Sequence, residues 1–142
     1  MRRPALAVAM IAIATLSLSA CDVLAPTRDT EGRIVKATQM PSTDAWVGDC
    51  FTFIDGSQLA WATVVPCDEP HTHVVIGTGT LSEKRKTAFD SLQLAVLSAC
   101  KDRYELYQAV QGAKFEAEYI VSDKTDHEGV TTTHYSCLVK SS

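Results

Sequence analysis

After residue 20 the chain has no apolar run that approaches the 20 or so residues a membrane-spanning helix needs. It also has no internal repeat, no C-x-x-C pair, no glycine-rich phosphate loop, no G-x-S-x-G and no H-E-x-x-H. These absences argue against a solenoid, a zinc ribbon, a nucleotide-binding loop, an α/β-hydrolase and a zincin. We therefore predict no cofactor, no resident metal and no catalytic residue, and expect a protein that is not an enzyme.

Basic residues are also few, because 13 lysines and arginines stand against 17 aspartates and glutamates. Two of the 13, Arg2 and Arg3, lie in the N-terminal leader, and without them the net charge is −6. A surface of that sign repels nucleic acid and anionic lipid headgroups. We therefore expect no nucleic-acid partner.

The first 20 residues have the order of a secretory signal peptide. Arg2 and Arg3 precede an apolar run over residues 5–20, which ends in Leu-Ser-Ala directly before Cys21. Residues 18–21 also match the bacterial lipobox, in which the cysteine sulfur receives a diacylglyceryl group and becomes the new N-terminus. The alternative is an ordinary signal followed by an incidental cysteine. We predict lipidation at Cys21 and anchoring by acyl chains, whose buried methylenes contribute about 0.8 kcal/mol each.

The remaining chain divides into a short polar segment and one domain. Residues 21–43 contain Pro26, Gly32 and Pro41 and predict a lipidated cysteine with a flexible tether, in which residues 34–38 are the candidates for an added edge strand. Residues 44–142 have the length of one domain. Their β-rich runs predict five strands, with a polar loop over 122–129; the strands are expected at 46–54, 59–65, 73–80, 115–121 and 130–139.

A change of periodicity predicts one long helix over residues 86–111. Ser82 or Thr87 is its expected N-cap, and Gly112 its expected C-terminal stop. The order βββαββ with short connections predicts an α+β fold, a small antiparallel sheet of about five strands covered on one face by the helix. The helix stripe recurs at three and four residues and consists of Phe89, Leu92, Val96, Cys100, Tyr104, Tyr107 and Val110.

The four cysteines beyond Cys21 predict two disulfides, because an even number in an exported chain favours oxidation. Cys100 lies on the helix stripe and Cys137 on a strand face, so a bond between them would join the helix to the sheet. Cys50 and Cys67 then pair by elimination. Their positions on adjacent strands require a loose hairpin between them.

The segment VVPCDEPHTHVV, residues 64–75, allows two chemical interpretations. Cys67 with His71 or His73 would form a thiol nucleophile and its base if the thiol were free. The two histidines with a neighbouring acid, Asp68 or Glu69, would hold a metal ion if a further ligand came close. The ligands required from elsewhere would be His127 or His134.

The third interpretation of this segment is structural, and it is the one we favour. Pro66 and Pro70 would stiffen a turn that the Cys67 disulfide holds. His71 would be buried, with a ring nitrogen bonded to the backbone or to a carboxylate such as Asp49 or Asp68. His71, Asp49 and Pro70 are thus the candidate structural or binding residues.

These stretches together carry a resemblance. WVGDCF at 46–51, the segment at 64–75, a cysteine within a helix and YSCLV on the last strand resemble the septum-formation domain family of actinobacterial lipoproteins and membrane proteins. That family is similar in its V-G-D-C-F opening, its V-x-x-V-P-C-x-x-P-H-x-x-E-V segment and two later cysteines. The likeness covers about Trp46 to Leu138. Val74 departs from it, since the family has an acid there.

The resemblance implies an extracytoplasmic, non-enzymatic domain associated with the cell envelope and cell division. With the lipobox, it predicts a lipid-anchored adaptor on the outer face of the cell membrane that binds an envelope protein. The sheet face not covered by the helix is its expected contact surface. The alternative is a small metal-binding or Cys/His hydrolytic protein that uses Cys67, His71 and His73.

Overall fold

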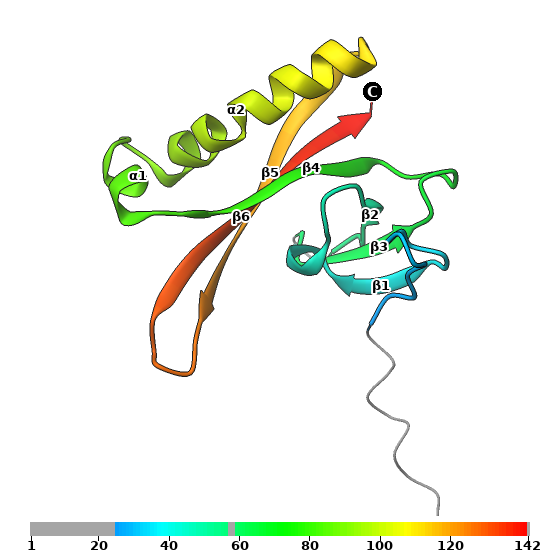
Figure 1. Ribbon diagram of the computed structural model, residues 1–142, viewed down its shortest axis with the longest axis horizontal. Coiled ribbons are helices and arrows are strands. Elements are labelled where there is room, and N and C mark those ends of the chain that lie inside the picture. The colour runs from blue at the N-terminus through cyan, green and yellow to red at the C-terminus, as the bar shows by residue number, and fades with distance from the viewer. Residues whose placement is uncertain (1–24, 57–58, 142) are drawn as a thin grey trace, which may run out of the picture.

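The computed structural model describes residues 25–56 and 59–141, so the predicted signal peptide and Cys21 lie outside the described residues. The fold is α+β, as predicted, with one antiparallel sheet and one long helix (Figure 1). The sheet has six strands in the order β1-β3-β2-β4-β6-β5. The elements are β1 (Thr38–Pro41), η1 (Ser42–Asp44), β2 (Cys50–Phe53), β3 (Trp61–Val65), β4 (His73–Leu81), α1 (Glu83–Thr87), α2 (Leu92–Gln111), β5 (Phe115–Thr125) and β6 (Thr131–Ser141).

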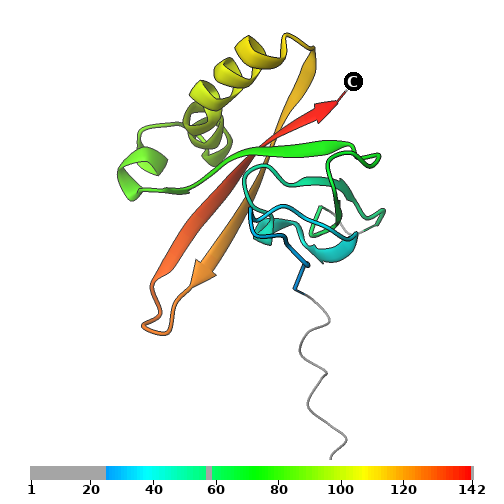
Figure 2. The same cartoon turned by 45° about the vertical axis from the view of Figure 1, so that its right-hand side comes forward.

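The strands β4, β6 and β5 form a long twisted ladder with α2 on one face (Figures 1 and 2). Val75 and Leu138 face the other side, because successive strand residues point to opposite faces. The β1–β3–β2 part of the sheet curls over that side. Two separate apolar clusters result. On the helix side lie Leu81, Ala95, Val96, Cys100 and Cys137, and on the other side Ile34, Met40, Ala45, Phe51, Ala62, Val64, Val75, Ile120 and Leu138.

Helix α2 is shorter than predicted. It begins at Leu92, where the Ser91 hydroxyl accepts from the Leu94 N–H at 3.2 Å, and a separate helix α1 is capped by Ser82. The predicted stop is confirmed, since Gly112 adopts a left-handed conformation with φ of 62°. The stripe is only partly buried. Val96 and Cys100 are buried and Tyr104 and Tyr107 half-buried, while Phe89, Leu92 and Val110 are exposed.

Strand β5 is longer than predicted, because the first half of the expected loop over 122–129 belongs to it, and β6 extends to Ser141. Asp123 accepts from the Thr133 hydroxyl at 2.7 Å, and Thr125 pairs with Thr131. The turn itself needs only Asp126 to Val130. The Asp126 carboxylate accepts two backbone N–H groups there, and Gly129 takes a φ of 81°.

The predicted tether over residues 21–43 is wrong for its described part. Ile34 and Met40 are buried in the core. The extra edge strand is Thr38–Pro41, which pairs with β3, and not residues 34–38. Folding of this segment therefore adds a sixth strand to the five predicted from periodicity.

Both disulfides have the predicted partners, Cys50 with Cys67 and Cys100 with Cys137. Cys100 and Cys137 are 0 % and 1 % exposed, so their bond lies inside the helix-side cluster. Cys50 is opposite Val65 in the hairpin, two residues before Cys67, which is the loose alignment expected. No helix in the described part of the chain is both long and apolar enough to cross a membrane.

Candidate functional site

The Trp46 loop, residues 46–49, connects η1 to β2 and is tied to β4 by its backbone. The Gly48 N–H donates to the Val75 carbonyl at 2.8 Å, and the Val75 N–H donates to the Asp49 carbonyl at 3.0 Å. Gly48 has a φ of 93°, a conformation that side chains with a Cβ rarely adopt. The loop therefore turns sharply and lies against the sheet.

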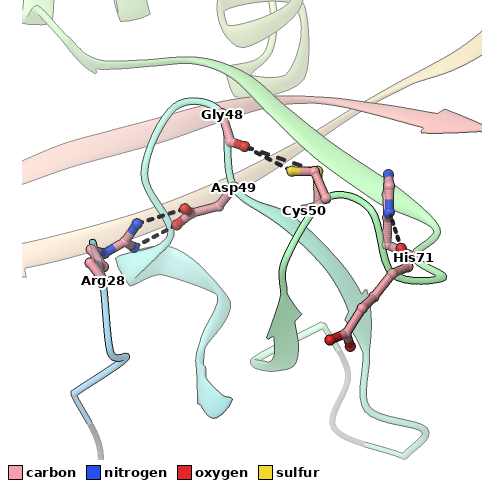
Figure 3. Close-up of a disulfide and its surroundings, with 7 residues drawn as sticks. Arg28, Gly48, Asp49, Cys50 and His71 are labelled. Carbon is pink, nitrogen blue, oxygen red and sulfur yellow. Dashed lines mark hydrogen bonds and ion pairs between the residues drawn. A yellow bond between two sulfur atoms is a disulfide. The ribbon is translucent and has the colours of Figure 1, made fainter. Parts of the chain in front are cut away.

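Asp49 holds the loop from inside (Figure 3). Its two carboxylate oxygens accept from the Arg28 guanidinium at 2.7 Å each, in a bidentate pair. The same carboxylate accepts the Trp46 backbone N–H at 2.7 Å. Arg28 lies in the segment predicted to be a tether, and both side chains of the pair are nearly inaccessible to solvent. Asp49 thus holds the loop through Arg28, a partner that the sequence did not indicate.

The indole of Trp46 stays on the surface while the backbone beneath it is fixed. The Arg28 guanidinium carbon lies 4.0 Å from the centre of the indole ring, a cation–π contact. Trp46 and Val47 are nonetheless both 58 % exposed. The loop therefore displays two neighbouring apolar side chains in a defined conformation.

The Cys50–Cys67 disulfide lies beside this loop (Figure 3). Sγ of Cys67 is 3.3 Å from the Gly48 carbonyl oxygen. This is a sulfur–oxygen contact, because a disulfide sulfur carries no proton to donate. While the disulfide exists, Cys67 also has no thiolate to act as a nucleophile.

The structure places His71 differently from the prediction. The ring is half-buried, in the turn before β4, and Nδ1 lies 2.8 Å from the Glu69 carbonyl oxygen. A carbonyl only accepts, so Nδ1 carries the proton and, in the neutral ring, Nε2 remains an acceptor. The expected backbone bond is present, but the expected deep burial and a bond to Asp49 or Asp68 are not. Pro70 is exposed in the same turn.

His73 has the buried role that was predicted for His71. It is 6 % exposed and stacks on Phe51 with 5.4 Å between ring centres. Nε2 is 3.1 Å from a Glu118 carboxylate oxygen, and Nδ1 is 2.7 Å from the Thr72 hydroxyl. Burial lowers the pKa of His73, an effect that the Glu118 carboxylate opposes. The neutral ring satisfies both contacts, with Nε2–H donating to Glu118 and Nδ1 accepting from Thr72.

The ligands required by the metal-binding interpretation do not come together. Within residues 25–56 and 59–141, no three His, Cys, Asp or Glu side chains lie close enough together to hold a metal ion. His71 and His73 are two residues apart, but their ring nitrogens are engaged by different partners. The structure thus brings Asp49, Cys67 and His71 into one region, in which Cys67 is bonded to Cys50.

A polar groove of about 540 Å³ lies beside the Trp46 loop. Trp46 and Asp44 form one wall, and Thr78 and Thr80 of β4 lie along it. Lys124, at the far end of the β5–β6 hairpin, reaches the Asp44 carboxylate at 3.5 Å. The remaining residues that line the groove are Thr43, Ala45, Gly79, His134, Tyr135 and Ser136.

Sequence reasoning missed this groove, since its walls are more than 30 residues apart in the chain. The one available signal is the run of small and polar residues Thr78, Gly79 and Thr80, which by itself predicts only part of a strand. A comparison of the chain with protein-family models, curated proteins and solved structures returns no match in any of the three.

Proposed function

We propose that the chain is a lipid-anchored, extracytoplasmic binding module of the cell envelope, without enzymatic activity, as its resemblance to septum-formation domains implies. The observation that supports this best is the Trp46 loop. Two large apolar side chains are held at the surface by a buried ion pair, two backbone bonds to β4 and a neighbouring disulfide. A surface of this kind is typical of a protein contact site, in which Trp and Arg are enriched.

The contact surface that we propose differs from the one expected from the sequence. The sheet face away from α2 is largely packed against the β1–β3–β2 part of the fold, with Phe51 and Leu138 fully buried between them. A partner would instead meet the rim formed by the Trp46 loop and the neighbouring groove. The lipobox at residues 18–21 and the two disulfides support a position outside the cytoplasm.

The alternative, metal or Cys/His hydrolytic chemistry, is the weaker proposal. Cys67 is bonded to Cys50, and the His71 ring is bonded to a backbone carbonyl. Among the described residues, no group of three His, Cys, Asp or Glu side chains could hold a metal ion.

Anchoring is tested by replacing Cys21 with Ser. Membranes and soluble extracts from cells that make either form are compared by immunoblotting. The variant should leave the membrane fraction or retain its uncleaved leader, because it lacks the sulfur that receives the lipid. A processed Cys21→Ser protein that remains bound to membranes would contradict the lipoprotein assignment.

The contact surface is tested by placing a photoreactive amino acid at single positions of the anchored protein. Val47 is the test position and Glu128, at the tip of the β5–β6 hairpin, is the control, since both are exposed. Crosslinks to one envelope protein should form from position 47 and not from position 128. Equal crosslinking from both, or none from position 47, would refute a partner at the Trp46 loop.

A further inference from the structure

We propose that the open edge of β4, which lies between α2 and the Trp46 loop, binds an extended peptide segment of a partner protein as an added strand. This inference rests on the proposed function and names the site and the chemistry of its partner. It starts from the pairing of β4. Strand β2 pairs with β4 only at His73 and Val74.

Beyond those two residues the outer edge of β4 has no strand beside it in the described part of the chain. The Trp46 loop bonds to Val75, and from Ile76 to Leu81 the only strand partner is β6. Gly77 to Leu81 pair regularly with Cys137 to Thr133. The free edge is therefore straight enough to pair with another strand.

The direction of the free backbone groups follows from Val75. Its N–H and C=O both bond to the Trp46 loop, so they point away from β6. In an antiparallel strand, the N–H and C=O of every second residue point in the same direction. The bulge between Val75 and Gly77 inserts one extra residue, so this alternation is shifted by one position after it. The outward groups are therefore those of Thr78 and Thr80. They offer two donors and two acceptors to an incoming strand.

This edge lacks the protection that the other two edges have. Strand β1 has only four residues and ends at Pro41, while β5 carries Glu116, Glu118, Asp123 and Lys124. Short length, proline and charge are the usual means of preventing edge pairing. The free stretch of β4, IGTGTL, has neither a charge nor a proline.

The residues on the two sides of the β4 edge indicate which side chains the peptide needs. Arg103 of α2 lies over Gly77, where an added Cβ would be 2.9 Å from its Cγ. Its guanidinium has no ion-pair partner among the described residues. Beside it Leu106 and Val110, 58 % and 71 % exposed, line an apolar hollow with Ile76. The partner strand should thus carry a carboxylate opposite Arg103 and an apolar side chain next to it.

On the other side of the β4 edge lies Trp46, which lines the polar groove together with Thr78 and Thr80. Side chains on the other face of the added strand would meet its exposed indole. Main-chain bonds to β4 would give affinity, and contacts with α2 and with Trp46 would give specificity, as in other cases of strand addition.

The test uses the full chain, purified from membranes in detergent, and a displayed library of random dodecapeptides. The enriched peptides should contain an acid and an apolar residue in an extended pattern. Synthetic copies should bind at least ten-fold more weakly to Thr78→Pro, which removes an outward N–H. Binding should also slow hydrogen exchange of the Thr78 and Thr80 amides.

Matched variants separate the site from general damage. Thr78→Lys, which keeps the backbone N–H, covers the case in which Thr78→Pro does not fold, and Thr132→Lys on β6 is its control. Arg103→Gln should weaken binding of the acidic peptides, while Arg85→Gln on α1 should not.

Three results would overturn the proposal. In the first, no peptide is enriched. In the second, the enriched peptides bind the Thr78 variants as well as they bind the parent protein. In the third, the chain self-associates and Thr78→Lys makes it monomeric, so that the occupant is a second copy. Each leaves the Cys21→Ser fractionation result unchanged, so failure of this site and failure of the anchored module are distinguishable.

Discussion

The two faces of the β4–β6–β5 ladder are covered by different means. On one face α2 buries only Ala95, Val96 and Cys100 of its 20 residues. On the other, the β1–β3–β2 part buries large side chains such as Phe51 and Val64. The helix is therefore fastened by a covalent bond at the centre of a thin cluster, whereas the curled part of the sheet is held by packing.

The disulfides follow the same contrast. Cys100–Cys137 is fully buried and connects two layers, while Cys50–Cys67 connects neighbouring strands of one layer, and Cys67 is exposed. A small amphipathic contact can thus hold a long helix when a crosslink supplies what packing does not. Much of the outer surface of that helix then remains free for other contacts.

The largest expected effect is the loss of the helix-side disulfide. Cys100→Ala with Cys137→Ala should lower the free energy of unfolding by about 4 kcal/mol, because a long loop is no longer closed in the unfolded chain. The matched double variant, Cys50→Ala with Cys67→Ala, removes a disulfide that closes a shorter loop. It should lower the free energy of unfolding by about 3 kcal/mol. Urea unfolding of both double variants measures the difference. A larger loss for the Cys50 pair would reverse our comparison of the two faces.

The next largest effect concerns the Arg28–Asp49 pair. Arg28→Ala should destabilise the protein by about 3 kcal/mol, because it leaves the Asp49 carboxylate buried without its cation. The same substitution at Arg33, an exposed partner of Asp29, is the control and should change stability little. Thermal unfolding measures the stability of the two variants. Equal effects would mean that the N-terminal segment is not fastened by the buried pair.

How much the sequence could predict depends on the distance over which each feature is set. The helix, its Gly112 stop and the strands β2 to β6 follow local periodicity, and the Cys100–Cys137 pair follows from the faces on which its two elements place it, which leaves Cys50 for Cys67. Strand β1 has four residues and is strand only because β3 lies beside it. Periodicity does not record such a neighbour.

The site was less predictable than the fold. Asp49 was expected as a partner of His71, whereas its partner in the structure is Arg28, 21 residues away in a segment that reads as polar linker. His71 and His73 lie on either side of Thr72 in the sequence. Only the packing against Phe51 and the contact with Glu118 decide which of the two is buried. The groove needs three distant segments. Each of these features depends on tertiary contacts and not on local composition.

A smaller effect of pH on stability is expected at His73. The pKa of His73 is lowered in the folded protein, so the native state favours the neutral ring. The stability this gives is present above the ordinary histidine pKa of about 6.5 and is lost as pH falls below it, because the unfolded chain then binds more protons. His73→Gln should have a flatter stability profile between pH 7.5 and 5. His71→Gln is the control, and an unchanged slope in His73→Gln would exclude His73 as the cause.

The smallest expected effect is at the free surface of α2, which shares the helix with the buried Val96. Leu106→Gln and Val110→Gln should each change the free energy of unfolding by less than about 0.5 kcal/mol, because both side chains are already in water. Val96→Ala should cost about 2 kcal/mol, since it removes two buried methyl groups and leaves a cavity. Urea unfolding compares the three variants under one set of conditions. If Leu106→Gln costs as much as Val96→Ala, the outer surface of α2 contributes to the core, and it is not available for the partner strand at β4. If the cost is small and binding of the selected peptides still falls, the exposed leucine serves recognition and not folding.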